Sequence, residues 1–426
     1  MNKRIYLCLA HMSGQEQKYI KEAFDTNWVV PLGPNVNGFE EDLKQFVESN
    51  PNGEKMSWAQ THGKEVVALS AGTAAVHLSL IALGVQAGDE VICQSFTFCA
   101  SCNPIKYLGA TPVFVDSEHD TWNMDPLLLE EAIKDRIDKT GRKPKAIVVV
   151  YLYGMPAKID EILAIAQKYD IPLIEDAAEG FGSRYRGRVC GTFGEYGVLS
   201  FNGNKMITTS GGGALICSDK EAKQNIMFYA TQARESYPYY QHEQIGYNYR
   251  MSNICAGIGR GQMTVLNEHI LHHKKLAALY EELFANISGI TFHQNPSEEI
   301  DSNYWLNTIT LAPELHVKGE EKAYAEKVQG AVGGAAGVTH NALSTHTDCE
   351  PNKNVEAMRM ALDAAGIESR PLWKPMHLQP VYKGSPSYIN GVSESLFKIG
   401  LCLPSGPYVS EKDVARIVTE IKQNIE

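Results

Sequence analysis

Short apolar runs alternate with helix-like segments from residue 66 to residue 176. The apolar runs are Val66–Leu69, Glu90–Cys93, Thr111–Asp116, Ala146–Tyr151 and Ile171–Asp176. The segments between them carry apolar residues at helical spacing over 74–83, 126–135 and 159–169. Apolar strands separated by helices predict βαβ units and an α/β fold with a large, mostly parallel sheet. Ligands of such sheets bind beyond the carboxyl ends of the strands, so residues at strand ends are the candidates for chemistry.

The pattern changes in the last third of the chain. A long helix is expected from about residue 253 to residue 286, with room for a break. Beyond it, a strand at 308–311 mixes with helices at 355–365 and 412–425, which indicates a smaller α+β domain. We therefore expect a large domain over residues 14–265 and a small one over 266–426, joined by residues 1–13. The polar stretches 50–64 and 319–353 are interpreted as surface insertions, and residues 5–10 as a strand.

Composition narrows the function classes. The chain has 426 residues, with 39 Lys and Arg against 50 Asp and Glu, for a net charge of -11. Hydrophobic residues make up 44%, enough for a buried core. The acidic balance argues against a nucleic-acid binder, although a local site can still hold an anion. No apolar run approaches the roughly 18 residues of a membrane span.

The cysteines point to a reducing compartment. There are nine, dispersed along the chain, which is typical of buried thiols in the cytoplasm rather than of a disulfide framework. Cys99 and Cys102 have the spacing of a redox or metal pair, but they lie in an apolar aromatic segment without a second pair. We interpret them as packing residues and expect no metal site.

Three features near strand ends have both an ordinary and a chemical interpretation. Asp176 ends an apolar strand after Glu175, where an acidic residue is most often a helix N-cap. Lys205 lies in an uncharged loop before three glycines; it is either a solvated lysine or one suited to Schiff-base chemistry. Ser70-Ala-Gly-Thr opens a helix after a strand, which permits tight packing or forms an anion site. It matches neither the Walker nor the dinucleotide spacing.

Together these features meet the needs of pyridoxal 5'-phosphate. That cofactor requires a lysine for its aldehyde, a carboxylate for its ring nitrogen, an anion site for its phosphate and an aromatic side chain over its ring. Phe98 follows a strand end and would supply the aromatic face, although a single Phe is more often a core residue.

The motifs resemble those of the DegT/DnrJ/StrS family of nucleotide-sugar aminotransferases, which have the aspartate-aminotransferase fold (fold type I). The resemblance covers nearly the whole chain. Its motifs are WVVPLGPNVNGFE, SAGTAAVHLSL, SFTFCAS, YLYGMPA, IEDAAEGFGS, SFNGNK, TTSGGGAL, GYNYRMSNI and LCLPSG.

The resemblance implies a role for each matching residue. Lys205 would bind the cofactor covalently, Asp176 would pair with its ring nitrogen, and Phe98 would stack on its ring. Glu179 would lie beside the cofactor. The phosphate contacts implied are Gly72, Thr73, Ala74 and Ser200, with Asn248 and Arg250 reaching the phosphate of the neighbouring subunit. The resemblance therefore also implies a homodimer with the active site at its interface.

Substrate contacts are less well defined. Trp28 and Asn202 stand where the family often borders the sugar nucleotide, and Lys374 and His377 are candidates from the small domain. A solvated lysine and a structural histidine are equally good interpretations of the last two. Ala71, Asn202 and Asn253 depart from the usual family residues, and those at 202 and 253 leave the orientation of the sugar open.

The spellings SFNGNK, RMSNICAGIGRGQ and ESRPLWKPMHLQPVY resemble the subgroup acting on UDP-4-keto-6-deoxy-GlcNAc, on the route to bacillosamine. The implied reaction moves the amino group of L-glutamate to the C4 keto group, with pyridoxamine phosphate between the two half-reactions and Lys205 as proton shuttle. Open alternatives are GDP-4-keto-6-deoxymannose or a 3-keto dTDP sugar as substrate, a sugar dehydratase, and a non-catalytic sugar-binding regulator. Lys205 argues against the dehydratase, since relatives of that type can carry His instead.

Overall fold

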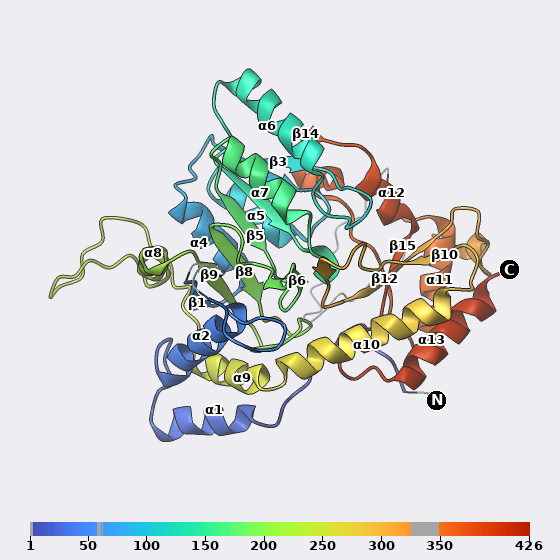
Figure 1. The fold of residues 1–426 in the computed structure, drawn as a ribbon, viewed down its shortest axis with the longest axis horizontal. Coiled ribbons are helices and arrows are strands. Elements are labelled where there is room, and N and C mark those ends of the chain that lie inside the picture. The colour runs from blue at the N-terminus through green and yellow to red at the C-terminus, as the bar shows by residue number, and fades with distance from the viewer. Residues whose placement is uncertain (1–2, 58–60, 62, 325–348) are drawn as a thin grey trace.

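A mostly parallel sheet forms the centre of the protein (Figure 1). The computed structural model describes residues 3–57, 61, 63–324 and 349–426. The eight strands run in the order β1 (Glu65–Leu69), β9 (Gly213–Cys217), β8 (Tyr196–Ser200), β5 (Leu173–Asp176), β4 (Ala146–Val150), β2 (Glu90–Gln94), β3 (Thr111–Val115) and β14 (Ser387–Tyr388). Every neighbouring pair is parallel except the two that β9 forms with β1 and β8. The predicted α/β class is therefore confirmed.

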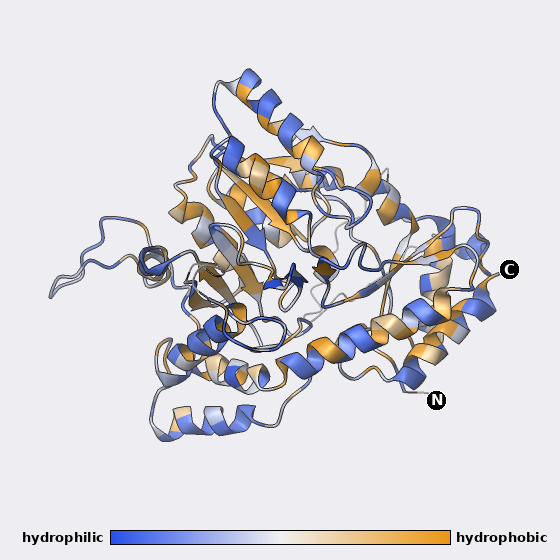
Figure 2. Ribbon diagram, viewed as in Figure 1, coloured by the Kyte–Doolittle hydropathy of each residue, from blue (hydrophilic) through white to orange (hydrophobic). Residues whose placement is uncertain are grey.

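Helices cover both faces of this sheet. One face packs against α2 (Pro34–Val47), α6 (Pro126–Thr140), α7 (Ile159–Lys168) and α9 (Asn253–Met263), and the other against α4 (Gly72–Ala82), α5 (Asn103–Tyr107) and α8 (Lys220–Ala230). Successive strand residues point to opposite faces, so Val66 packs in the first layer and Val67 in the second. Burial on both faces explains why the strands are continuous apolar runs (Figure 2).

A second, antiparallel sheet forms the small domain. Its order is β10 (Ile290–Phe292), β12 (Asn307–Leu311), β15 (Gly400–Leu403) and β13 (Arg370–Pro371). Side chains from α10 (Leu266–Phe284), α11 (Lys353–Ala364) and α13 (Glu411–Asn424) pack with it in one hydrophobic cluster. The expected long helix is two helices, α9 and α10, and α10 runs from the large sheet to the small one (Figure 1).

The remaining elements are short. Besides five single-turn 3-10 helices, the described residues form α1 (Glu16–Asp25), β6 (Arg184–Tyr185), β7 (Arg188–Val189), β11 (Ile300–Asp301) and α12 (Val392–Ile399). The segment between α8 and α9 projects from the body of the molecule (Figure 1). Among the residues described, no helix combines the length and apolarity needed to cross a bilayer.

Two details differ from the expected pattern. The strand expected at residues 5–10 is wrong: Ile5 makes a single bridge to Ile367, and Tyr6 and Leu9 are exposed instead of alternating with buried positions. The chain also returns to the large sheet late, because β14 lies within the stretch assigned to the small domain. Asp125 caps the start of α6, since its side chain accepts from the Leu127 and Leu128 N–H groups. Most of the insertion expected at 319–353 lies outside the described residues.

Candidate active site

A cavity of about 340 Å³ lies at the carboxyl ends of the central strands. Val150, Asp176 and Ser200 line it from the ends of β4, β5 and β8. Trp305, just before β12, and Trp373, just after β13, line it from the small domain. The cavity is thus built by both domains, at the edge of the sheet where parallel folds bind ligands.

Lys205 enters this cavity from the loop between β8 and β9. Its Nζ lies 3.4 Å from Glu179 Oε1 and 4.0 Å from the centre of the Trp305 ring. The indole in turn donates from Nε1 to the Asn204 carbonyl at 2.6 Å. The lysine side chain is only 14% exposed, so the solvated interpretation does not hold.

Asp176 and Glu175 end β5 with opposite orientations. Asp176 lines the cavity; its Oδ2 accepts from Ser101 Oγ at 2.6 Å and its Oδ1 from the Ala178 N–H at 3.1 Å. Burial raises the pKa of Asp176, opposed by these two hydrogen bonds and by the charge of Lys205. Glu175 instead accepts hydrogen bonds from Tyr151 and from three backbone N–H groups, those of residues 191, 193 and 194. The structure therefore separates a cavity carboxylate from a structural one.

Gly72 and Thr73 form the first turn of α4 at the wall of the cavity, opposite Ser200. The backbone packs closely here. A Cβ atom on Gly72 would lie 3.1 Å from Ser200 Cβ, and one on Gly213 would lie 2.4 Å from Gly72 N. Among the described residues, no side chain caps the helix start, so its N–H groups are available to an anion. Ala74 belongs to the same turn but is buried behind the wall.

Glu179 and Phe98 complete the part of the site that the sequence predicted. Glu179 is 4% exposed; burial raises its pKa to about 7, against the opposing effects of Lys205 and of the Tyr153 N–H, which donates to Oε2 at 2.7 Å. Phe98 is 55% exposed and its ring centre lies 5.4 Å from that of Trp373. Asn202 also lines the cavity.

Five other candidates lie outside the cavity wall. Arg250 pairs with Glu40 and donates to the Ala68 carbonyl at 2.9 Å, and Asn248 bridges to Thr231 in the backbone. Lys374 donates to the Cys349 carbonyl at 3.0 Å. The remaining two are His377, whose Nδ1 is 2.6 Å from Ser95 Oγ, and Trp28, which is 39% exposed.

Asn253, one of the departures from the family pattern, has a structural contact. Its Oδ1 accepts from the backbone N–H groups of Asn35 and Val36, at 2.9 and 3.2 Å, at the start of α2. The side chain therefore satisfies a helix terminus, in the manner of a capping residue.

Several residues of the wall were given no role by the sequence motifs. Ser101, Trp305 and Trp373 line the cavity although no motif argument singled them out. Ser101 stands in the quoted motif SFTFCAS, and the tryptophans flank short strands of the small domain. Only the packing of the small domain on the large one brings the tryptophans to Lys205.

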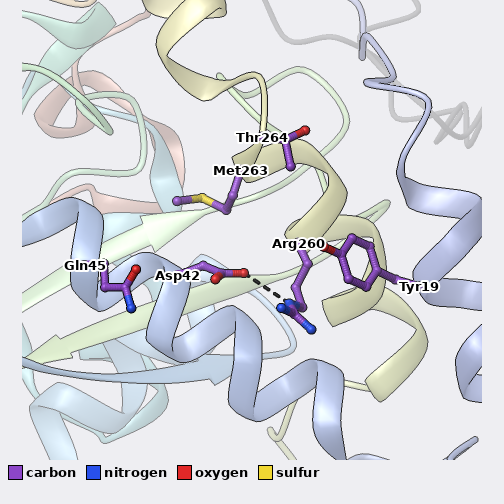
Figure 3. A pocket seen from close by; sticks show the side chains of 6 residues that line it. All are labelled: Tyr19, Asp42, Gln45, Arg260, Met263 and Thr264. Atoms are coloured by element: carbon purple, nitrogen blue, oxygen red, sulfur yellow. Dashed lines mark hydrogen bonds and ion pairs between the residues drawn. The ribbon is translucent and has the colours of Figure 1, made fainter. Parts of the chain in front are cut away.

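A second hollow, of about 250 Å³, lies between α1, α2 and α9 (Figure 3). Arg260 Nε lies 3.2 Å from Asp42 Oδ2, and its guanidinium lies 4.6 Å from the centre of the Tyr19 ring. Since these charged groups satisfy one another and the lining contains no lysine, this hollow offers no comparable chemistry.

The main cavity fits pyridoxal phosphate. Lys205 can bind an aldehyde, Asp176 can hold a protonated ring nitrogen, and the start of α4 with Ser200 can hold a phosphate. The close contacts at Gly72 and Gly213 are those expected where backbone must approach a ligand.

Comparisons with known proteins agree with this chemistry. The chain matches the DegT/DnrJ/EryC1/StrS aminotransferase family over residues 10–332 and 326–422. It is 42% identical over 422 residues, 98% of this chain and 95% of the relative, to EpsN of Bacillus subtilis (strain 168), named provisionally as a pyridoxal phosphate-dependent aminotransferase. It is 33% identical over 413 residues, 97% of this chain and 96% of the relative, to a GDP-perosamine synthase of Escherichia coli O157:H7.

The fold agrees as well. The crystal structure of a DegT DnrJ EryC1 StrS aminotransferase from Brucella abortus superposes with a TM-score of 0.79 at 26% identity, covering 96% of this chain and 95% of that one. The fold is thus that of the fold type I aminotransferases, as the motifs predicted. The chain belongs to the DegT/DnrJ/EryC1/StrS aminotransferase family and is a pyridoxal phosphate-dependent enzyme.

Proposed function

We propose that the enzyme transfers the amino group of L-glutamate to the C4 keto group of a UDP-4-keto-6-deoxy-N-acetylhexosamine, giving a UDP-4-amino sugar and 2-oxoglutarate. The observation that carries the aminotransferase chemistry is the meeting of Lys205 and Asp176 in one cavity. The choice of sugar rests on the resemblance of three segments, among them ESRPLWKPMHLQPVY, to one subgroup of the family.

Each residue has a definite task in this proposal. Pyridoxal phosphate, when bound, withdraws electrons from the carbon that loses its proton. Lys205 Nζ would hold the cofactor, and its amine would take the Cα proton of the amino donor. Asp176 would keep the ring nitrogen protonated, and the N–H groups of Gly72 and Thr73 with Ser200 Oγ would hold the phosphate. The aromatic side chains of Phe98, Trp305 and Trp373 line the cavity, and Trp305 lies beside Lys205.

The names of the relatives differ in the nucleotide that carries the sugar, so an experiment must identify it. One is named as a GDP-perosamine synthase, and others as a UDP-2-acetamido-2-deoxy-3-oxo-D-glucuronate aminotransferase and a dTDP-3-amino-3,4,6-trideoxy-alpha-D-glucose transaminase. GDP-4-keto-6-deoxymannose and a 3-keto dTDP sugar are therefore the competing substrates.

We also propose a homodimer in which Asn248 and Arg250 lie beside the neighbouring subunit's site. The segment Trp28–Leu32 supports this, because it exposes four large apolar side chains, Trp28, Val29, Val30 and Leu32. A contiguous exposed apolar segment is typical of a protein–protein contact. We also propose a cytoplasmic enzyme, since the described cysteines are thiols rather than disulfides.

The test is a panel of UDP-, GDP- and dTDP-ketosugars with glutamate, with product stereochemistry assigned by NMR. We expect turnover of the UDP-4-keto sugar by the wild type and none by Lys205→Ala. Preference for a GDP or 3-keto substrate would overturn the choice of sugar. Steady-state transamination by the Lys205→Ala variant would overturn the assignment of the lysine. Bound cofactor whose absorption does not respond to glutamate would favour the dehydratase or the regulator.

A further inference from the structure

We propose that Ser101, supported by Thr97, is a positioning residue that holds Asp176 as an oriented carboxylate toward the cofactor ring. This inference rests on the proposed role of Asp176. The new element is a chain of two hydrogen bonds, which we call the hydroxyl relay: the Thr97 hydroxyl donates to the Ser101 hydroxyl, and the Ser101 hydroxyl donates to the Asp176 carboxylate.

The distances define the direction of the hydroxyl relay. Ser101 Oγ lies 2.6 Å from Asp176 Oδ2, and Thr97 Oγ1 lies 2.9 Å from Ser101 Oγ. An ionised carboxylate only accepts hydrogen bonds, so Ser101 is the donor to Asp176. Because the Ser101 hydroxyl proton points to Asp176, the Ser101 oxygen accepts a hydrogen bond from the Thr97 hydroxyl. The relay therefore runs one way and ends on the acid.

Burial makes the hydroxyl relay effective. Thr97 and Ser101 are each 1% exposed and Asp176 is 5% exposed. Hydrogen bonds to a charged acceptor are stronger than neutral ones, and in a dry site water cannot replace them. Both hydroxyls belong to the segment that follows β2, where the turn Cys99–Ser101 is closed by a hydrogen bond from Ser101 N to the Phe98 carbonyl. The segment that carries Phe98 to the cavity thus also aims Ser101 at Asp176.

The hydroxyl relay leaves acceptor capacity on the acid for the ring. A carboxylate has about four acceptor positions, and the described partners of Asp176 are Ser101 on Oδ2 and the Ala178 N–H on Oδ1. Burial alone raises the pKa of Asp176, and the Ser101 hydrogen bond opposes that rise. Without Ser101 the acid would bind a proton more readily and would compete with the ring nitrogen for it.

The test follows the ring nitrogen directly. The cofactor-free enzyme is reconstituted with pyridoxal phosphate labelled with ¹⁵N in the ring, and the nitrogen chemical shift is measured against pH. We expect Ser101→Ala to lower the proton affinity of the ring nitrogen about tenfold, the size of one pKa unit. Ser101→Thr keeps a hydroxyl and should restore the wild-type titration, and Thr97→Val should have a smaller effect.

Two controls separate the possible outcomes. Ser79→Ala removes another buried hydroxyl, one that donates to a helix carbonyl at 2.8 Å, and should leave the titration unchanged. Asp176→Asn should abolish ring protonation. If Asp176→Asn shifts the titration and Ser101→Ala does not, the hydroxyl relay is wrong while the role of Asp176 stands. If Asp176→Asn has no effect either, the role assigned to Asp176 is wrong.

Discussion

At the scale of single residues, two adjacent acids show how differently one motif is used. Glu175 and Asp176 are both buried at the end of β5, but alternate strand residues face opposite sides. Glu175 accepts hydrogen bonds from the Tyr151 hydroxyl and from three backbone N–H groups of the loop before β8. Asp176 keeps acceptor capacity that faces the cavity. One acid therefore holds the fold and the other is available for chemistry.

Glu175→Ala should unfold more easily than the wild type. The substitution leaves buried N–H donors without partners, at a cost of about 3 kcal/mol. Urea unfolding followed by circular dichroism measures the change. The paired variant Asp176→Asn should stay within about 1 kcal/mol of the wild type while losing most of its activity. Equal stabilities of Glu175→Ala and the wild type would contradict the structural role.

Glu179 should give the cofactor-free protein a measurable pH dependence. Its pKa is raised from 4.5 to about 7, so between these values the folded protein holds a proton that the unfolded chain has released. Stability from this site is complete below pH 4.5 and is lost as the pH rises toward 7, by about 3 kcal/mol in total.

The measurement compares wild-type protein with Glu179→Gln, whose neutral amide replaces the protonated acid. Urea unfolding at several pH values should show the variant gaining stability relative to the wild type as the pH rises. Parallel pH profiles for the two proteins would rule out the raised pKa.

At the scale of elements, the proposed phosphate site at the start of α4 depends on how closely this helix approaches β9. Gly213 begins β9, and a Cβ atom there would lie 2.4 Å from Gly72 N and 2.5 Å from the Ala71 carbonyl carbon. These are backbone atoms, so they cannot rotate away as a flexible side chain would. The strand thus sets the position of the first turn of the helix.

Gly213→Ala should displace the start of α4. We expect stability to fall by about 1–3 kcal/mol, as for other overpacked sites, and cofactor affinity to fall at least tenfold because the N–H groups move. Equilibrium dialysis of pyridoxal phosphate measures the affinity. Gly203→Ala is the matched control, since a Cβ atom on Gly203 meets no atom of the described residues within 4 Å. Unchanged affinity in Gly213→Ala would show that the helix start does not hold the phosphate.

At the scale of the whole molecule, the site lies where the large and small domains meet. Asp116, in the large domain, is hydrogen-bonded by the backbone N–H groups of residues 390, 391 and 393, from the chain's late return to the large sheet. That connection holds the second domain against the cavity, where Trp305 and Trp373 form the wall. The exposed segment Trp28–Leu32 suggests that a further copy of the chain completes the assembly.

Leu32→Asp should weaken the proposed dimer. Leu32 is 53% exposed, and a charge buried there on association would be costly. Sedimentation velocity should show a dimer for the wild type and a shift toward monomer for the variant. Leu127→Asp is the control, because Leu127 is 80% exposed at the start of α6, where an acidic residue is tolerated. A wild-type monomer, or identical behaviour of both variants, would contradict the interface.

Much of the fold could be predicted from the sequence because its signals are local. The apolar runs at β1, β4 and β5 and the helical spacing of apolar residues in α6 identify these elements by periodicity. Residues 5–10 were mispredicted because an apolar run alone does not show whether a strand has a partner. The late return of β14 is a long-range pairing that no local pattern reveals.

The candidate site divides in the same way. Lys205, Asp176 and Gly72 were predicted from residues near strand ends and from the family resemblance. Which of two adjacent acids faces the cavity, and that Ser101 donates to it, depends on the orientation of side chains in a packed core. The tryptophan wall depends on two domains meeting. The sequence by itself determined the family and the reaction class; the tertiary structure decided the contacts of distant segments, because these arise only when the chain folds back on itself.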